Sequence, residues 1–325
     1  MEFSQLTENL TNPALLFFLL GIFAVQVKSD LKIPETSSKF IAIYLLLSIG
    51  FKGGQELSHS GINEEIIYSL LLGIMMAAAI PVLSFFLLKN RLSVENAGAI
   101  AASYGSVSAV TFVTAISFLD FQGIHYGGHM IAVMAGMEAP AIIVGVSLIH
   151  FFKGEKHRRP TLDRPAQSLL GHSLTNGSVL LILGSLMIGF LASEQQAEGI
   201  RPFTTDIFKG FLAVFLLDMG ITSGRQLTAI LNKGLFPFIF AILMPFMHGL
   251  LALGLSTLIT DDPGNQLLFS ILAASASYIA VPAAMKQAVP KANPSLYLPM
   301  ALGITFPVNV ILGIPFYHSL IQAFG

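Results

Sequence analysis

Ten apolar runs divide this chain, and most of them are long enough to cross a lipid bilayer. A helix needs about 20 predominantly apolar residues to span the hydrocarbon core. Only 11% of the 325 residues are charged and 54% are hydrophobic, too few charges to cover the surface of a soluble protein of this size. The sequence therefore predicts an all-α polytopic membrane protein. The predicted spans are residues 13–27, 40–51, 66–88, 97–119, 130–152, 179–192, 210–221, 234–259, 267–289 and 296–324.

Four of these runs are shorter than a straight span requires: the first two of each half of the chain. A short run has to recruit flanking polar residues, tilt, or lie against other protein. We expect these four spans to differ structurally from the other six.

The basic residues give the orientation. With the loop between spans 5 and 6 in the cytoplasm, all but three of the 17 Lys and Arg residues fall inside, and the exceptions are Lys52, Arg201 and Lys209. This asymmetry satisfies the positive-inside rule. It predicts an even number of spans with both termini outside.

The two halves of the chain resemble each other. Residues 47–55 match 217–225, residues 105–111 match 276–282, and residues 136–140 match 303–307. Because each half holds an odd number of spans, the second copy enters the membrane from the opposite side, as in the inverted repeats of secondary transporters. We predict a first five-helix repeat at 1–152, a cytoplasmic connector at 153–177 and a second repeat at 178–325.

Spans 4 and 9 are small and polar at what should be the middle of the membrane, around residues 101–109 and 273–277, with Pro282 just after the second stretch. Gly, Ser and Pro weaken a helix, and irregular backbone survives at this depth only inside protein or beside a wet cavity. We predict two broken, antiparallel helices that cross. Their half-helix N-termini would suit a small anion, and hydroxyls and freed carbonyls would suit Na⁺. The alternative is tight packing through small residues.

Carboxylates inside apolar spans are functional candidates because they are costly there. Glu138, beside Ala139-Pro140 in span 5, is a candidate cation or proton site. Asp218 in span 7 can equally snorkel or pair with Arg225. Lys52 can face a vestibule or snorkel to the interface.

The histidines suggest no transition-metal site. His125 and His129 have metal-pair spacing, but Gly127-Gly128 lies between them and no third ligand is near. His248 in span 8 is expected to be a hydrogen-bonded core histidine. The basic run 153–164 is expected to be a solvated connector. With a net charge of −1 and no catalytic motif, nothing indicates nucleic-acid binding or an enzyme.

These features resemble the sodium-dependent bicarbonate transporter family of cyanobacteria, the SbtA type, over nearly the whole chain. The most specific stretch is residues 290–297, followed by Ile314-Pro315. Ile49-Gly50 with Gly53-Gly54, and residues 137–141, also fit the family pattern.

The resemblance implies a mobile core of spans 3–5 and 8–10, a scaffold of spans 1, 2, 6 and 7, a homotrimer and an elevator-like movement. Ser108 and Thr111 match hydroxyl positions of the family's span 4. Ser275, Ser277 and Pro282 match its span 9. Glu138 takes the place of an Asp. Na⁺ and bicarbonate would bind between the half-helix ends.

Three departures from the family pattern bear on the substrate. Ala109-Val110 replace Gly-Ser, Tyr278 replaces an Asp, and Ala280-Val281 replace Ser-Gly. The Tyr278 hydroxyl can donate to an anion in place of the lost carboxylate. The short loop between spans 5 and 6 does not favour the family's PII-like regulatory partner.

We therefore expect a Na⁺-coupled symporter of bicarbonate or a similar small anion, with no cofactor besides the coupling ion. Another small solute, carried with Na⁺ or protons, is the alternative, and a membrane ligand sensor is a third. The predicted substrate-binding residues are Gly105, Ser106, Ser108, Thr111, Ser275, Ser277 and Tyr278. The predicted Na⁺-binding residues are Ser103, Ser108, Glu138, Ser275 and Thr305.

Overall fold

The computed structural model describes residues 13–61, 63–153, 177–231 and 234–324, and the regular structure in those ranges is helical. The first half holds the helices α2 (Pro13–Gln26), α3 (Glu35–Ser60), α4 (Glu64–Leu88), α5 (Val94–Gly105), α6 (Ala109–Gln122) and α7 (His129–Phe152). The connector between the halves falls largely outside the described residues, so the prediction for residues 153–177 stays a prediction.

The helices of the second half have more interruptions. It begins with α9 (Gly177–Leu191), α10 (Glu194–Arg201), the π-helical turn η2 (Pro202–Asp206), α11 (Phe208–Leu231) and α12 (Leu235–Ser256). It continues with α13 (Pro263–Ala274), α14 (Ala280–Ala288) and a last irregular helix. That helix runs through α15 (Pro294–Pro299), η3 (Met300–Thr305), α16 (Phe306–Val308), η4 (Asn309–Gly313) and α17 (Ile314–Phe324).

Seven helical stretches in the described ranges are long and apolar enough to cross a membrane, and two further apolar helices, at Leu15–Gln26 and Gly177–Leu191, are shorter. The predicted all-α, multi-pass class is therefore confirmed. The exact number of spans and the inverted repeat remain predictions, because α13 and α14 are each short.

The four short apolar runs lie in helices of two different lengths. The second run of each half lies within a longer helix, α3 with 26 residues and α11 with 24, which takes in flanking polar residues. The first run of each half corresponds to a short helix, α2 or α9. α2 packs mainly on α11, and α9 packs mainly on α3.

Two glycines that lie 170 residues apart make equivalent contacts in these pairs. A Cβ on Gly50 of α3 would lie 2.7 Å from the Ile182 carbonyl oxygen of α9, and a Cβ on Gly220 of α11 would collide with the Phe18 carbonyl of α2. Both positions therefore need glycine for close helix approach. The sequence match between residues 47–55 and 217–225 therefore coincides with two similar glycine contacts between helices.

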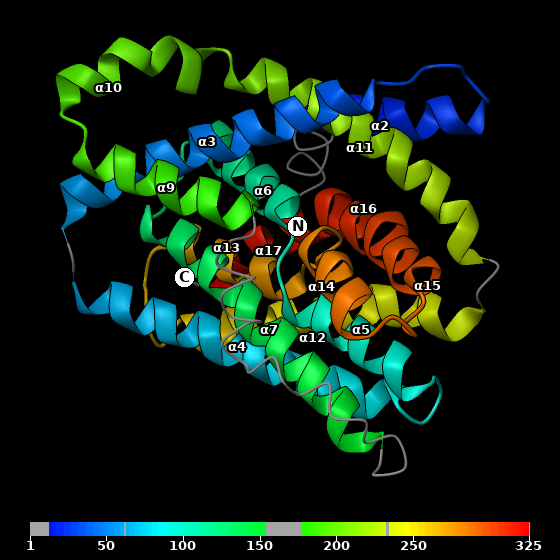
Figure 1. Cartoon of the computed structure of the whole chain (residues 1–325). Coiled ribbons are helices and arrows are strands. Elements are labelled where there is room, and N and C mark those ends of the chain that lie inside the picture. The colour runs from blue at the N-terminus through cyan, green and yellow to red at the C-terminus, as the bar shows by residue number, and fades with distance from the viewer. Residues whose placement is uncertain (1–12, 62, 154–176, 232–233, 325) are drawn as a thin grey trace.

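Following the division predicted from the sequence, we use the name scaffold group for α2, α3, α9, α10 and α11, and the name core group for α4–α7 and α12–α17. In Figure 1, α2, α3 and α10 run along the upper edge, and α4, α5, α7 and α12 lie below them. Within the core group α4, α5 and α7 pack together, α12 packs on α13, and α13 packs on α6 and α17. The broken helices α5–α6 and α13–α14 both belong to the core group.

Candidate functional site

The first predicted break is present between α5 and α6. α5 ends at Gly105, and the three residues Ser106–Ser108 leave the helical path before α6 begins at Ala109. Ser108 is the N-cap residue of α6, and its Oγ accepts a hydrogen bond from the Thr111 N–H at 3.2 Å. Serine is a preferred N-cap because its hydroxyl satisfies a backbone donor that has no partner in the first turn. The break therefore exposes the N-terminus of a new helix.

The second break, between α13 and α14, is longer. It runs from Ser275 to Ile279, and α14 begins at Ala280. Pro282 is the third residue of α14 rather than part of the break. A proline is tolerated in the first turn, where its missing N–H removes no helical hydrogen bond, and its ring disfavours a helix just before it. Pro282 therefore helps to fix where the helix resumes.

The two breaks lie against each other. The Ser277 N–H donates to the Ser103 carbonyl at 2.7 Å, and the Ser103 Oγ donates to the Ser277 carbonyl at 2.6 Å. The Ser108 N–H donates to the Ser275 Oγ at 2.9 Å. Serines from both segments thus satisfy backbone groups that the broken helices leave free. Both predicted breaks are therefore present and in contact, and we call their contact the crossing; the antiparallel arrangement of two broken spans in a membrane stays a prediction.

A pocket with about 330 Å³ of empty space, part of it open to solvent, lies at this crossing. It brings together four of the predicted site residues: Ser108, Ser277, Tyr278 and Glu138. Its other lining residues are Val107, Ser178, Ile279 and the first residues of the two half-helices, Ala109 and Ala280. Because α6 and α14 both begin here, the positive ends of two helix dipoles face the pocket.

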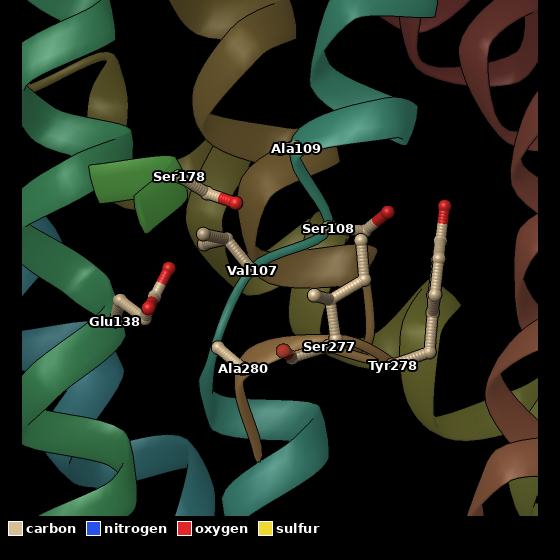
Figure 2. A pocket seen from close by; sticks show the side chains of 9 residues that line it. Val107, Ser108, Ala109, Glu138, Ser178, Ser277, Tyr278 and Ala280 are labelled. Atoms are coloured by element: carbon tan, nitrogen blue, oxygen red, sulfur yellow. The ribbon is translucent and has the colours of Figure 1, made fainter. Parts of the chain in front are cut away.

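The polar side chains lie on two sides of the pocket. Glu138 of α7 and Ser178 of α9 are on one side of the Val107 backbone, and the hydroxyls of Ser108 and Tyr278 point away from them on the other side (Figure 2). The carboxylate and the two neutral donors are therefore separated. Such an arrangement can hold a cation and an anion in adjoining positions.

Two hydroxyls near the crossing have no hydrogen-bond partner in the described part of the chain: those of Tyr278 and Ser106. Both oxygen atoms are buried. A buried hydroxyl without a partner costs about 1–3 kcal/mol, so such groups usually serve a ligand or an ordered water. Both residues were predicted to bind substrate.

The other predicted residues lie near the pocket without lining it. Ser103 and Ser275 join the two breaks, Gly105 packs against Pro81 of α4, and the backbone N–H of Thr111 bonds to its cap. Thr305 lies in a separate network, 2.7 Å from the Tyr104 hydroxyl, and donates to the Ala241 carbonyl at 2.9 Å. The structure therefore does not bring Thr305 to Glu138.

Ser178 is a candidate that the sequence analysis missed. It is the second residue of α9 and lines the pocket with Glu138, although the two belong to different halves of the chain. The only local signal is the small, polar start of span 6 at Gly177-Ser178. Asn309 was also missed: its Nδ2 donates to the Ala274 carbonyl at 2.7 Å, at the end of α13.

Three interpretations of single residues need correction. Lys52 forms an ion pair with Asp120 of α6 at 3.1 Å rather than only snorkelling. Asp218 accepts a hydrogen bond from the Ser38 hydroxyl of α3 at 2.5 Å. Among the described residues, no ion pair joins Asp218 to Arg225. His248 is buried as expected, but within the described residues neither ring nitrogen has a hydrogen-bond partner.

His125 and His129 lie in different surroundings despite their spacing. His125 is in the turn between α6 and α7 and contacts Asp262 and Glu56, whereas His129 is the first residue of α7. His125 precedes α7, so the two histidines do not share a helix, as Gly127-Gly128 suggested.

The sequence comparisons agree with this architecture. No curated protein gives a significant match to the chain. A family match covers residues 13–322, from the first residue of α2 nearly to the end of α17, and therefore includes both breaks and every residue of the pocket. The family resemblance read from residues 290–297 and from the glycine motif is thereby confirmed. The chain belongs to the Na⁺-dependent bicarbonate transporter superfamily.

Proposed function

We propose that this protein is a secondary active transporter that couples Na⁺ to the movement of bicarbonate or a similar small anion. The observation that carries the proposal is the pocket at the crossing, where two half-helices begin and where hydroxyls and one carboxylate line the same space. Membership of a Na⁺-dependent bicarbonate transporter superfamily supports the choice of ions.

The anion would bind at the half-helix N-termini. The N–H groups of the first turns of α6 and α14 are donors of the kind that bind small oxyanions. Hydroxyls of Ser108, Ser277 and Tyr278 would add donors that do not carry charge. Ser106 would contribute its buried hydroxyl. Gly105 allows the end of α5 to pack closely on Pro81 of α4.

Coupling follows from the charges of the pocket. None of the nine lining residues, all within the described ranges, is Lys, Arg or His, so these residues offer no basic side chain to neutralise a bound anion. An uncompensated charge at membrane depth is costly. A cation that binds beside the anion removes most of this cost, so the two should move together.

The Na⁺ site would centre on the Glu138 carboxylate. Ser178 is on the same side of the pocket and offers a hydroxyl oxygen (Figure 2). Ser103 and Ser275 are further oxygen ligands at the crossing, since a hydroxyl that donates its proton keeps lone pairs for a hard cation. The Ser108 hydroxyl points to the other side of the pocket (Figure 2), so it would serve the anion rather than Na⁺. Thr305 is the weakest member of the predicted set because its hydroxyl already serves Tyr104 and Ala241.

The movement would be that of an elevator, in which the core group slides against the scaffold group. The matching contacts of Gly50 and Gly220 support a ten-span inverted repeat, because each joins the first and second helices of opposite halves. A homotrimer in a bacterial plasma membrane, with both termini outside, completes the proposal.

The test is uptake of radiolabelled bicarbonate into proteoliposomes with and without an inward Na⁺ gradient, at fixed pH. We expect accumulation that depends on Na⁺. Uptake driven by a pH gradient alone would assign a proton-coupled carrier instead. Saturable binding with no flux, in protein of verified orientation, would overturn transport and favour a ligand sensor.

A further inference from the structure

The scaffold and core groups meet at a compact polar contact between α3 and the turn that joins α6 to α7. Lys52 of α3 pairs with Asp120 of α6 at 3.1 Å. One turn further along α3, Glu56 Oε1 lies 3.2 Å from His125 Nε2. Two side-chain pairs therefore bridge the groups along one face of α3.

The backbones touch between these two pairs. A Cβ on Gly128, just before α7, would collide with the Gly53 carbonyl oxygen, and a Cβ on Gly53 would collide with the Ile131 side chain. The contact with backbone requires glycine at position 128, whereas a Cβ at position 53 would displace the end of the Ile131 side chain. The contact therefore combines close backbone packing with the two side-chain pairs.

His125 also reaches a third element. Its Nδ1 lies 2.7 Å from Asp262 Oδ2, and Asp262 is the N-cap residue of α13, whose Oδ1 accepts from the N–H groups of Gly264 and Asn265 at 2.8 and 3.0 Å. His125 thus links α3 of the scaffold group to the start of broken helix α13–α14. A displacement of α13 relative to α3 would break at least one of the two contacts.

The chemistry of imidazole makes this link depend on a proton. Both neighbours of the ring, Glu56 and Asp262, are carboxylates and accept hydrogen bonds. A neutral imidazole can donate to only one of them and turns a lone pair toward the other, whereas the imidazolium donates to both. Only protonated His125 holds both partners.

Carboxylates predominate among the titratable groups around the His125 ring. The titratable and charged groups that surround His125 are Glu56 of α3, Glu65 of α4, Asp120 of α6 with its partner Lys52, Tyr126 beside it, His129 of α7 and Asp262 at the start of α13. The carboxylates outnumber the basic groups, and the pKa of His125 is raised above its ordinary value of 6.5, first by its hydrogen bond to Asp262 and then by Glu56. The His125 side chain is 67% exposed, so protons from the solvent reach it.

We propose that His125, with Glu56 and Asp262, forms a proton-sensitive latch that holds the core group against the scaffold group in the observed conformation. The inference rests on the proposed alternating-access function. The sign follows from the raised pKa: the contact is complete below about pH 6.5, and it weakens as the pH rises through the pKa of His125 in the folded protein. The Lys52–Asp120 pair provides a second part of the contact, which does not involve His125.

The first test compares Na⁺-driven uptake by the wild-type protein, His125→Gln and His59→Gln at matched pH. His59 is the control because it also pairs with a carboxylate, Glu194 at 3.5 Å, but both residues belong to the scaffold group. Near pH 5.5 we expect His125→Gln to transport about threefold faster than the wild type, the size expected for an exposed ion pair, with equal rates near pH 8.5. His59→Gln should follow the wild type. Equal rates of all three proteins at both pH values would overturn the latch.

The second test does not need transport. The chain has no cysteine, so Lys52→Cys with Asp120→Cys gives a single thiol pair across the contact, to be bridged by a short bifunctional reagent. At acidic pH we expect a higher cross-linking yield with His125 present than with His125→Gln, and equal yields at alkaline pH. Equal yields at both pH values would overturn the latch even if flux were normal. Absence of flux in the wild type, with His125-dependent cross-linking, would instead reject the proposed function and keep the contact.

Discussion

Ser103 and Ser277 exchange two hydrogen bonds across the crossing of the broken helices, one through each residue's carbonyl oxygen. The Ser103 hydroxyl and the Ser277 N–H are the two donors, and both residues are almost fully buried. Each break therefore supplies the hydrogen-bonding partner that the other break lacks.

The Ser103→Ala variant removes one of these bonds and leaves the Ser277 carbonyl without its donor. We expect the free energy of unfolding to fall by about 1–2 kcal/mol, since a buried acceptor loses its partner. The measurement is thermal unfolding of the purified protein in detergent. Ser319→Ala is the matched control, because the Ser319 hydroxyl bonds to Pro315 within its own helix. A shift no larger than that of the control would show that the crossing does not depend on this bond.

The two scaffold glycines, Gly50 and Gly220, lead to a prediction about the stability of the folded protein. In Gly220→Ala the new methyl group meets the Phe18 carbonyl, which is backbone and cannot rotate away. We expect a loss of about 1–3 kcal/mol in stability, as for other overpacked sites, and the same direction for Gly50→Ala. Gly136→Ala is the control, since a Cβ there meets nothing within 4 Å. Yields of folded protein after purification provide the measurement, and equal yields of all three variants would contradict the symmetric packing.

The local pattern was enough to predict where the helices break. Ser and Gly at residues 103–108, and Ser at 275 and 277, weaken a helix at membrane depth, so these positions carried the signal in themselves. The Lys52–Asp120 and His125–Asp262 pairs join residues 68 and 137 positions apart, and no local pattern states which distant charge a side chain will meet. Ser178 was missed for the same reason, because its importance comes only from its position beside Glu138.

Ser108 has two roles that substitution can separate. Ser108→Ala removes the N-cap of α6 and a hydroxyl of the pocket, so we expect about 1 kcal/mol less stability and a much larger loss of uptake. Ser93→Ala removes an equivalent cap from α5, away from the pocket, and should affect stability alone. Uptake per folded molecule is the deciding measurement. Unchanged uptake in both Ser108→Ala and Ser277→Ala would mean that the substrate binds elsewhere.

Tyr278→Phe tests the hydroxyl that has no partner in the described residues. Because the hydroxyl makes no protein hydrogen bond of normal geometry and its nearest polar neighbour is Ser108, we expect little change in thermal stability, together with about a tenfold higher KM for the anion, the size of one hydrogen bond. Tyr44→Phe is the contrasting control: the Tyr44 hydroxyl donates to the Phe203 carbonyl at 2.6 Å, so its loss should lower stability and leave KM unchanged. A KM for Tyr278→Phe equal to that of the wild type would exclude the hydroxyl from the anion site.

Glu138→Gln tests the proposed coupling ion. The amide keeps the size and a carbonyl oxygen of the side chain but removes the charge that would hold Na⁺. We expect the Na⁺ concentration for half-maximal uptake to rise at least tenfold, about 1.4 kcal/mol, with normal folding. Glu95→Gln is the control, since Glu95 pairs with Lys153 at 3.1 Å away from the pocket. If Glu138→Gln kept the wild-type Na⁺ response while Tyr278→Phe weakened anion binding, the anion site would stand and the cation would have to bind at other oxygen atoms of the crossing, such as those of Ser103 and Ser275.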